Sequence, residues 1–457
     1  MDRSGGTAYP ALWQVFGPQQ RRAAMRARNL WRGRVAVAIG LAGALALAAC
    51  GGASDSGANS SGEIKGTIDF WMGDPIGDAQ QPIMQKLADD YAAAHPGTKV
   101  NLRFLGKDAH QTYLTSIAGG SVPCVALIGN TWTPEFAALN ALEVYANDPK
   151  TLQGTYVPGM IESTIFKGKS YAVPYDTGVR ALIYRKDMLE AIGKTAAPAT
   201  WQELREDALA IQAKNQGVNG FGIIGGAHWY YLPLIWNWGG EIAKQSGDKW
   251  VSEAGSTQSV QAFQFYSDLL TKDRLSPAGA SAWTAADVDK SMGLGQTAMM
   301  VGGSWDLRTI LKQSPDLEGK LGTAVLPKGP GGNNDTFAGG SNLAVFRECN
   351  NKAVANDFVK FMMTKENLVP VTSNLGLLPA TNDALAQEKA TGSFSAPLFK
   401  AYAEQADHTR SIPPVASWGK VEGANSIVNA MQSIMSGKKT ADVAMKELAD
   451  QVNQAIG

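Results

Sequence analysis

The sequence predicts an α/β protein of two lobes, each built on a sheet that helices cover. Three observations lead to this prediction. Strand-like and helix-like segments alternate over residues 64–128, the alternation resumes over residues 200–346, and about 400 residues follow a short leader. The order strand, helix, strand, helix, strand indicates parallel pairing, because a parallel connection needs a crossover that is usually a helix.

The first lobe begins with a strand in which apolar side chains recur among polar ones. Ile83, Leu87 and Tyr91 then recur four residues apart, which is typical of one helical face. A His-Pro-Gly sequence at residues 95–97 ends that helix. The elements expected here are a strand at 64–70, a helix at 78–94, a strand at 100–104, a helix at 109–118 and a strand at 125–128.

The same alternation continues in the second half. Thr200 and Glu203 form a capping box that begins a helix. The elements expected after it are this helix at 200–214, a strand at 221–224, a helix at 257–270, strands at 299–301, 324–326 and 343–346, and helices at 422–435 and 440–455.

Charge and composition exclude several classes of protein. Lys plus Arg and Asp plus Glu both number 41, so no net field attracts nucleic acid or an anionic surface. The four histidines are scattered, no HExxH motif occurs, and we expect neither a metal nor a cofactor. Twelve Trp and twelve Tyr supply flat rings with a polar edge, which suit a partly wet ligand.

The chain opens with the features of an export signal. Residues 21–34 carry six arginines and no acid, and the 15 residues of 35–49 are uncharged, apolar and too few to cross a bilayer. The sequence LAACGG at 47–52 resembles a bacterial lipobox, which implies that residues 1–49 are a signal peptide and that Cys50 is lipidated. Residues 50–63 are then the lipidated cysteine with a flexible tether. An ordinary signal peptide with an incidental cysteine is the alternative, and translation starts at Met1 or Met25.

Five segments in order resemble the extracellular solute-binding proteins of carbohydrate ABC importers, the maltose-binding-like group. They are LTSIAGGSVPC at 114–124, SYAVPYDTGVRALIYRKD at 170–187, PATWQEL at 198–204, GQTAMMVGGSW at 295–305 and GGSNLAVF at 339–346. Each segment is weak evidence alone, but together they cover most of residues 64–435.

The resemblance implies a two-lobed periplasmic-binding-protein-like (type II) fold with the ligand cleft between the lobes. The N-lobe is expected at 64–174 with 323–372 returning to it, and the C-lobe at 175–322 with 373–457. The lobes are expected to open and close about the strands near 173–178 and 320–325. The expected function is capture of a neutral sugar by a monomer and its delivery to an ABC permease, without catalysis. The lipid at Cys50 would hold the protein on the outer face of the cytoplasmic membrane.

A sugar site needs rings against the C–H faces and carboxylates or amides around the hydroxyls. Candidates that follow strand ends, or that match cleft positions of the family, meet this need. For each candidate a structural role, in a turn, a helix cap or the core, is the alternative. The substrate-binding candidates are Asp74, Asn130, Trp132, Glu135, Asp176, Trp229, Trp305, Asn342 and Trp418.

The residues alone leave open the state of two cysteines, the function and the class of ligand. The resemblance places Cys124, where the family usually has Asp, in the same lobe as Cys349. Two small buried residues without a bond are the favoured interpretation, and a disulfide is the alternative. A glycoside hydrolase that uses two of Asp74, Glu135 and Asp176 as acid and base is the rival function, and a sensory or adhesive lipoprotein is another. Glycerophosphodiesters are rival ligands.

Overall fold

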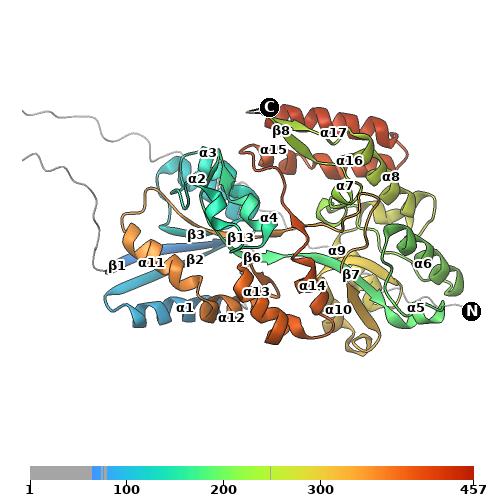
Figure 1. Ribbon diagram of the computed structural model, residues 1–457, viewed down its shortest axis with the longest axis horizontal. Helices are drawn as coiled ribbons and strands as arrows, with labels where there is room; N and C mark the ends of the chain where they lie inside the picture. Colours follow the sequence, from blue (N-terminus) through green and yellow to red (C-terminus); the bar gives the residue numbers. More distant parts are fainter. Residues whose placement is uncertain (1–63, 74–75, 77–79, 248) are drawn as a thin grey trace, which may run out of the picture. The chain divides into compact units, whose positions relative to one another are not determined.

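The computed structural model describes residues 64–73, 76, 80–247 and 249–457. The signal peptide, Cys50, the tether and Asp74 therefore lie outside the described residues. Figure 1 shows two sheets, each with its own helices, which we call the first and the second lobe.

The first lobe is built on a sheet of six strands in the order β14-β6-β13-β3-β1-β2. The first three strands along the chain are parallel, as predicted, whereas β13 runs antiparallel to both of its neighbours. The strands are β1 (Gly66–Gly73), β2 (Thr98–Gly106), β3 (Val125–Gly129), β6 (Val173–Gly178), β13 (Gly339–Val345) and β14 (Leu378–Pro379).

Helices cover both faces of this sheet, which explains why β3 is apolar throughout. Val125 and Leu127 pack with one set of helices, while Ala126 and Ile128 pack with the other set on the opposite face. The first set is α1 (Gln81–Ala94), α11 (Lys352–Met362) and α12 (Lys365–Leu375), and the second is α2 (Ala109–Gly119) and α3 (Thr133–Ala138).

The second lobe contains a three-stranded sheet and the larger hydrophobic core. Its central strand β7 (Arg180–Arg185) pairs antiparallel with β10 (Met299–Gly303) and β11 (Leu321–Ala324). The parallel sheet that the recurring alternation predicted is therefore wrong here. Only Val179 separates β6 from β7, so the chain enters this sheet by a direct extended crossing instead of a helical crossover.

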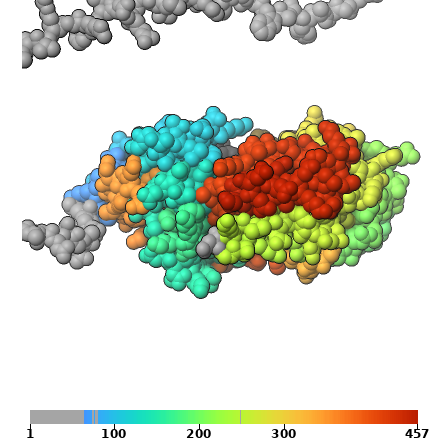
Figure 2. Space-filling view, turned by 90° about the horizontal axis from the view of Figure 1, so that it is seen from above, coloured from blue at the N-terminus to red at the C-terminus, as the bar shows by residue number. Residues whose placement is uncertain are grey.

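Many helices surround this second core. The C-terminal helices, red in Figure 2, pack against α8 and β9. The principal elements are α5 (Lys186–Ala191), α6 (Trp201–Lys214), α7 (Leu234–Asn237), β8 (Ala243–Ser246), β9 (Lys249–Ser252), α8 (Thr257–Thr271), α9 (Ala285–Gly293), α10 (Ser304–Gln313), α13 (Asn382–Thr391), α14 (Lys400–Gln405), α15 (Trp418–Gly423), α16 (Ser426–Met435) and α17 (Ala441–Ile456). Shorter elements are α4 (Pro158–Ser163), β4 (Ile165–Phe166), β5 (Lys169–Ser170), β12 (Thr336–Phe337) and β15 (Thr409–Arg410).

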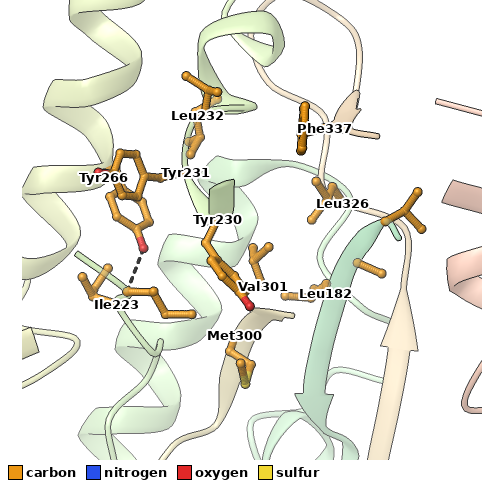
Figure 3. Packing of buried hydrophobic residues seen from close by; sticks show 14 of the residues in the cluster. Leu182, Ile223, Tyr230, Tyr231, Leu232, Tyr266, Met300, Val301, Leu326 and Phe337 are labelled. Carbon is orange, nitrogen blue, oxygen red and sulfur yellow. Dashed lines mark hydrogen bonds between the residues drawn. The ribbon is translucent and has the colours of Figure 1, made fainter. Parts of the chain in front are cut away.

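Two predicted elements differ from the structure. Residues 221–224 are not a strand, because the N–H of Ile223 donates to the side chain of Ser276 and the N–H of Ile224 donates to that of Tyr266. The dashed line in Figure 3 marks the bond to Tyr266. The helix expected at 422–435 is two helices, α15 and α16. Asn425 between them has a left-handed φ of 51°, which interrupts the helical path.

The segment at 323–372, which was expected to return to the first lobe as a whole, divides between the two lobes. Strand β13 and helices α11 and α12 belong to the first lobe. The earlier residues 323–338, which the sequence analysis assigned to the same return, instead end β11 and place Leu326 and Phe337 in the second core. Beyond residue 373, β14 pairs with β6 in the six-stranded sheet.

Cys124 and Cys349 form a disulfide, so the favoured interpretation of two unlinked buried residues is wrong. Cys124 precedes β3 and Cys349 follows β13, and these two strands are antiparallel neighbours with Val125 opposite Val345. The register therefore brings the two cysteines together, with Cα atoms 4.5 Å apart. Sequence spacing alone, 225 residues, gave no sign of this proximity.

Candidate functional site

A first group of aromatic and acidic side chains gathers beyond the end of β3. This group, the His110 cluster, comprises His110, Trp132, Glu135, Trp418 and Glu422. The Nε2 atom of His110 lies 2.7 Å from a carboxylate oxygen of Glu135, and its ring centroid lies 4.9 Å from that of Trp132. Helix α15 approaches closely, since a Cβ atom built on Gly419 would lie 3.5 Å from the Glu135 carboxylate.

A second group lies at the crossing between the lobes. This group, the Arg180 cluster, comprises Arg180, Trp229, Tyr230, Trp305 and Asp306. The guanidinium carbon of Arg180 is 4.4 Å from the ring centroid of Tyr230 and 5.3 Å from that of Trp305. Asp306 accepts hydrogen bonds from the Tyr230 hydroxyl, at 3.1 Å, and from the Gly303 N–H, at 2.8 Å.

One short segment, residues 337–339, touches both clusters or their immediate neighbours. The Phe337 ring stacks on Trp229 with centroids 4.3 Å apart, and the Ala338 carbonyl accepts a 2.7 Å hydrogen bond from the side chain of Asn130, two residues before Trp132. Gly339 pairs with Gly178, and a Cβ on Gly178 would lie 2.7 Å from the Trp305 ring. The two clusters are therefore parts of one region at the junction of the lobes.

Similarity to known proteins identifies the family of the chain. The sequence profile of the bacterial extracellular solute-binding proteins matches residues 77–368. The chain belongs to this family.

Relatives of this solute-binding protein agree in fold. The diacetylchitobiose binding protein DasA of Streptomyces coelicolor is 28% identical and covers 93% of this chain and 98% of its own. A putative binding protein of Brucella suis is 27% identical over 80% and 88% of the two chains. The sugar-binding protein MalE of Xanthomonas citri has a TM-score of 0.75 at 23% identity, with 86% and 97% covered, which shows the two-lobed periplasmic-binding fold. Maltose-bound MalE3 of T. maritima has a TM-score of 0.69 at 26% identity, with 85% and 99% covered.

These relatives are named as binding proteins, and the family is defined by solute binding, so the chain is a binding protein rather than an enzyme. The rival hydrolase receives no support from them. Among the described residues, no group of three or more His, Cys, Asp or Glu side chains is arranged to hold a metal ion. Within the same residues, no helix has the length and apolarity that a membrane crossing requires.

Four of the predicted site residues are partly exposed in the solute-binding protein. Trp132 and Glu135 lie in the His110 cluster, and Trp229 and Trp305 lie in the Arg180 cluster. Partial exposure leaves part of each side chain within reach of a solute, which a ligand contact requires, although Phe337 stacks on the Trp229 ring. The structure thus brings these four to the lobe junction, and their contact with a ligand stays a prediction.

The other described candidates are buried. Asn130 holds the Ala338 carbonyl, and the Asn342 amide donates to the hydroxyls of Thr133 and Ser163. Trp418 is 1% exposed and lies beside Glu422, whose pKa burial raises to about 7 while the Trp418 indole N–H lowers it. Contact between ligand and these side chains stays a prediction.

Asp176 is fully buried in the crossing strand β6. One carboxylate oxygen accepts the N–H of Ser341 at 3.1 Å, and the other has no hydrogen-bond partner among the described residues. Burial raises the pKa of this carboxyl to about 7, and the Ser341 hydrogen bonds lower it by less. Its ligand role also stays a prediction.

We expect Asp176→Asn to stabilise the protein relative to wild type as the pH rises from about 4 to 7. The folded pKa, about 7, lies above the ordinary aspartate pKa of 3.8 that applies to the unfolded chain. The carboxyl therefore contributes stability below pH 4 that is lost as the pH rises through 7. The difference should level off above neutrality at on the order of 4 kcal/mol. Urea unfolding across this range measures it, with the exposed Asp316→Asn as control. A difference that does not vary with pH would contradict the expectation.

The sequence analysis missed His110, Arg180 and Glu422. His110 and Glu422 each lie on a helix, where the pattern predicts only a polar face. Arg180 falls within the resembling segment at 170–187, but its position in an extended run indicates burial and gives no sign of the rings around it. Burial and, less strongly, Arg180 lower the pKa of the nearby His228 to about 4, so this imidazole is neutral at neutral pH.

Proposed function

We propose that this solute-binding protein captures a neutral sugar between its lobes and delivers it to the permease of an ABC importer. The observation that carries the proposal is the pair of clusters at the lobe junction. One presents partly exposed Trp132 and Glu135, and the other presents partly exposed Trp229 and Trp305. Indole faces suit the C–H faces of a sugar ring, and carboxylate oxygens suit vicinal hydroxyls. Relatives named for diacetylchitobiose, lactose and maltotriose binding support this class of ligand.

Binding of the sugar would also explain why the two lobes close. A ligand that touches both clusters binds the closed arrangement better than an open one, and this difference in affinity shifts the equilibrium. The extended crossing at β6–β7 is where the backbone would flex. The two bodies of this proposal keep the lobe boundaries of the sequence analysis, except that all of β6 and β14 go with the first lobe and the later return starts at β13.

The location follows from the family and the leader. The family is extracellular, and we further propose that a lipid on Cys50 tethers a monomer to the outer face of the cytoplasmic membrane near the permease. Mass spectrometry of the N-terminal peptide tests this, since an unmodified Cys50 in membrane-associated protein would rule out the anchor.

Calorimetric titration with mono-, di- and oligosaccharides tests the sugar proposal. We expect saturable heat without product, and a loss of about 10- to 100-fold in affinity for Trp229→Ala and for Trp305→Ala, because each removes a ring that the sugar would stack on. Trp250→Ala is the matched control, since Trp250 is also partly exposed but lies in β9, outside both clusters.

The same samples measured by small-angle scattering report on closure. We expect a decrease in radius of gyration that saturates together with the heat. Heat without that decrease would contradict closure alone, whereas no heat with any saccharide would contradict the sugar proposal.

A further inference from the structure

Arg180 is a cation buried without a hydrogen-bond partner. The residue is 8% exposed, and no hydrogen bond or ion pair of its guanidinium occurs among the described residues. Its Nε atom is shielded from solvent and unpartnered. The two terminal amino groups are not fully shielded from solvent. The exposed fraction of the side chain therefore includes these N–H donors, which can reach a ligand.

The protein supplies rings around this cation but no acceptor. Tyr230 and Trp305 contact the guanidinium by cation–π interactions, which orient the group and leave its N–H donors free. The Asp306 carboxylate, which interacts electrostatically with Arg180, uses its Oδ2 atom for the Tyr230 hydroxyl and the Gly303 N–H. A buried hydrogen-bond donor without an acceptor lowers the stability of the fold, and a charged donor lowers it more. A ligand that supplies an acceptor removes this cost.

Charge in the cluster is nevertheless close to balanced. Arg180 lowers the pKa of Asp306, so the two interact electrostatically although they share no hydrogen bond, and this opposes the larger effect of burial. His228, beside Trp229 with ring centroids 4.0 Å apart, is neutral at neutral pH. Asp289 is buried, and burial together with the charge of Asp306 raises its pKa, which favours its neutral form. Arg180 therefore has a countercharge in the cluster but no oxygen atom that accepts a hydrogen bond from it.

We infer that Arg180 is a ligand-binding residue whose terminal N–H groups donate to neutral oxygen atoms of the sugar, hydroxyl or amide carbonyl, beside Trp305. This inference rests on the proposed function and narrows it. The guanidinium fork supplies parallel donors that fit two neighbouring oxygens. Asp306 supplies the countercharge, so a sugar carboxylate or phosphate gains no preference at this position.

Titration of the best neutral sugar into wild type, Arg180→Met and Arg180→Lys tests the donor role. We expect Arg180→Met to bind at least about tenfold more weakly, because the ligand oxygens lose their donors, and Arg180→Lys to recover part of the loss. Arg308→Met is the matched control: Arg308 also stacks on a ring, that of Phe399 at 4.8 Å, and should leave affinity within about twofold. Circular dichroism checks folding, and if Arg180→Met does not fold, the Lys variant carries the test.

The countercharge is tested with a matched pair of ligands, the neutral sugar and its uronic acid. Wild type should bind the acid no more tightly than the neutral sugar. Asp306→Asn removes the negative charge at nearly constant shape and should raise the acid-to-neutral affinity ratio by about tenfold. An unchanged ratio, or a wild type that prefers the acid, would overturn the neutral-acceptor assignment.

The outcomes separate this inference from the proposed function. Wild-type binding of a sugar together with wild-type affinity in both Arg180 variants would overturn the inference and leave the sugar proposal standing. No binding of any sugar by wild type would overturn both.

Discussion

Removing the disulfide by Cys124→Ser with Cys349→Ser is expected to lower the free energy of unfolding by about 3–5 kcal/mol. The bond closes a loop of 225 residues, and a cross-link over so long a loop restricts the unfolded chain strongly. It also holds the start of β3 to the chain that leaves β13, and these two strands lie side by side in the middle of the six-stranded sheet. Guanidinium unfolding of wild type and double variant measures the loss.

Reduction provides the control. Wild type treated with reductant should lose the same stability as the double variant, whereas the variant itself should not respond to reductant. Equal stability of wild type and variant would contradict the expectation. Sugar affinity should change little at low denaturant, because neither cysteine belongs to the His110 or the Arg180 cluster.

Much of the first lobe could be predicted because local patterns decide it. Ile68 and Phe70 alternate toward one core of this lobe. In the second lobe, the side chain of Thr200 accepts the N–H of Glu203 at the start of α6, as the capping box indicated, whereas the Glu203 carboxylate accepts the N–H of Ala199 instead of that of Thr200. The errors arise where distant residues decide. Residues 221–224 look like a strand, but the hydroxyls of Ser276 and Tyr266 take the N–H groups that a neighbouring strand would accept.

The site shows the same division. Position after a strand end located Trp132 and Glu135, since strand ends meet at one edge of a sheet. The same rule selected Asn130, and the family-like segment at 339–346 supplied Asn342. Neither could show that the two amides donate to Ala338, Thr133 and Ser163 from elsewhere in the chain. Arg180 was missed for the opposite reason. Arg180 is a candidate because no hydrogen-bond acceptor lies against its guanidinium among the described residues. The hydrogen-bond partners of a side chain are known only from the folded structure.

Gly340→Ala is expected to destabilise the protein by about 3 kcal/mol or more and to weaken sugar binding. Gly340 has a φ of 156°, and a Cβ atom there would lie 2.1 Å from the backbone carbonyl oxygen of Asp176. That distance is far below van der Waals contact, and the obstacle is backbone, which cannot rotate away. The strands β13 and β6 would have to separate at the pairing of Gly340 with Thr177.

The separation would reach the site directly. Gly339 and Gly178 are the next pair along the same two strands, and Gly178 contacts the Trp305 ring. Gly217→Ala is the matched control, because Gly217 has a φ of 83° but open space around its Cβ position. That variant isolates the cost of backbone strain, about 1 kcal/mol, from the cost of the clash. If the two variants lose equal stability in urea unfolding, the close approach of β13 to β6 is not what requires glycine. If Gly340→Ala is destabilised but binds sugar with wild-type affinity, the crossing strands do not position the Arg180 cluster.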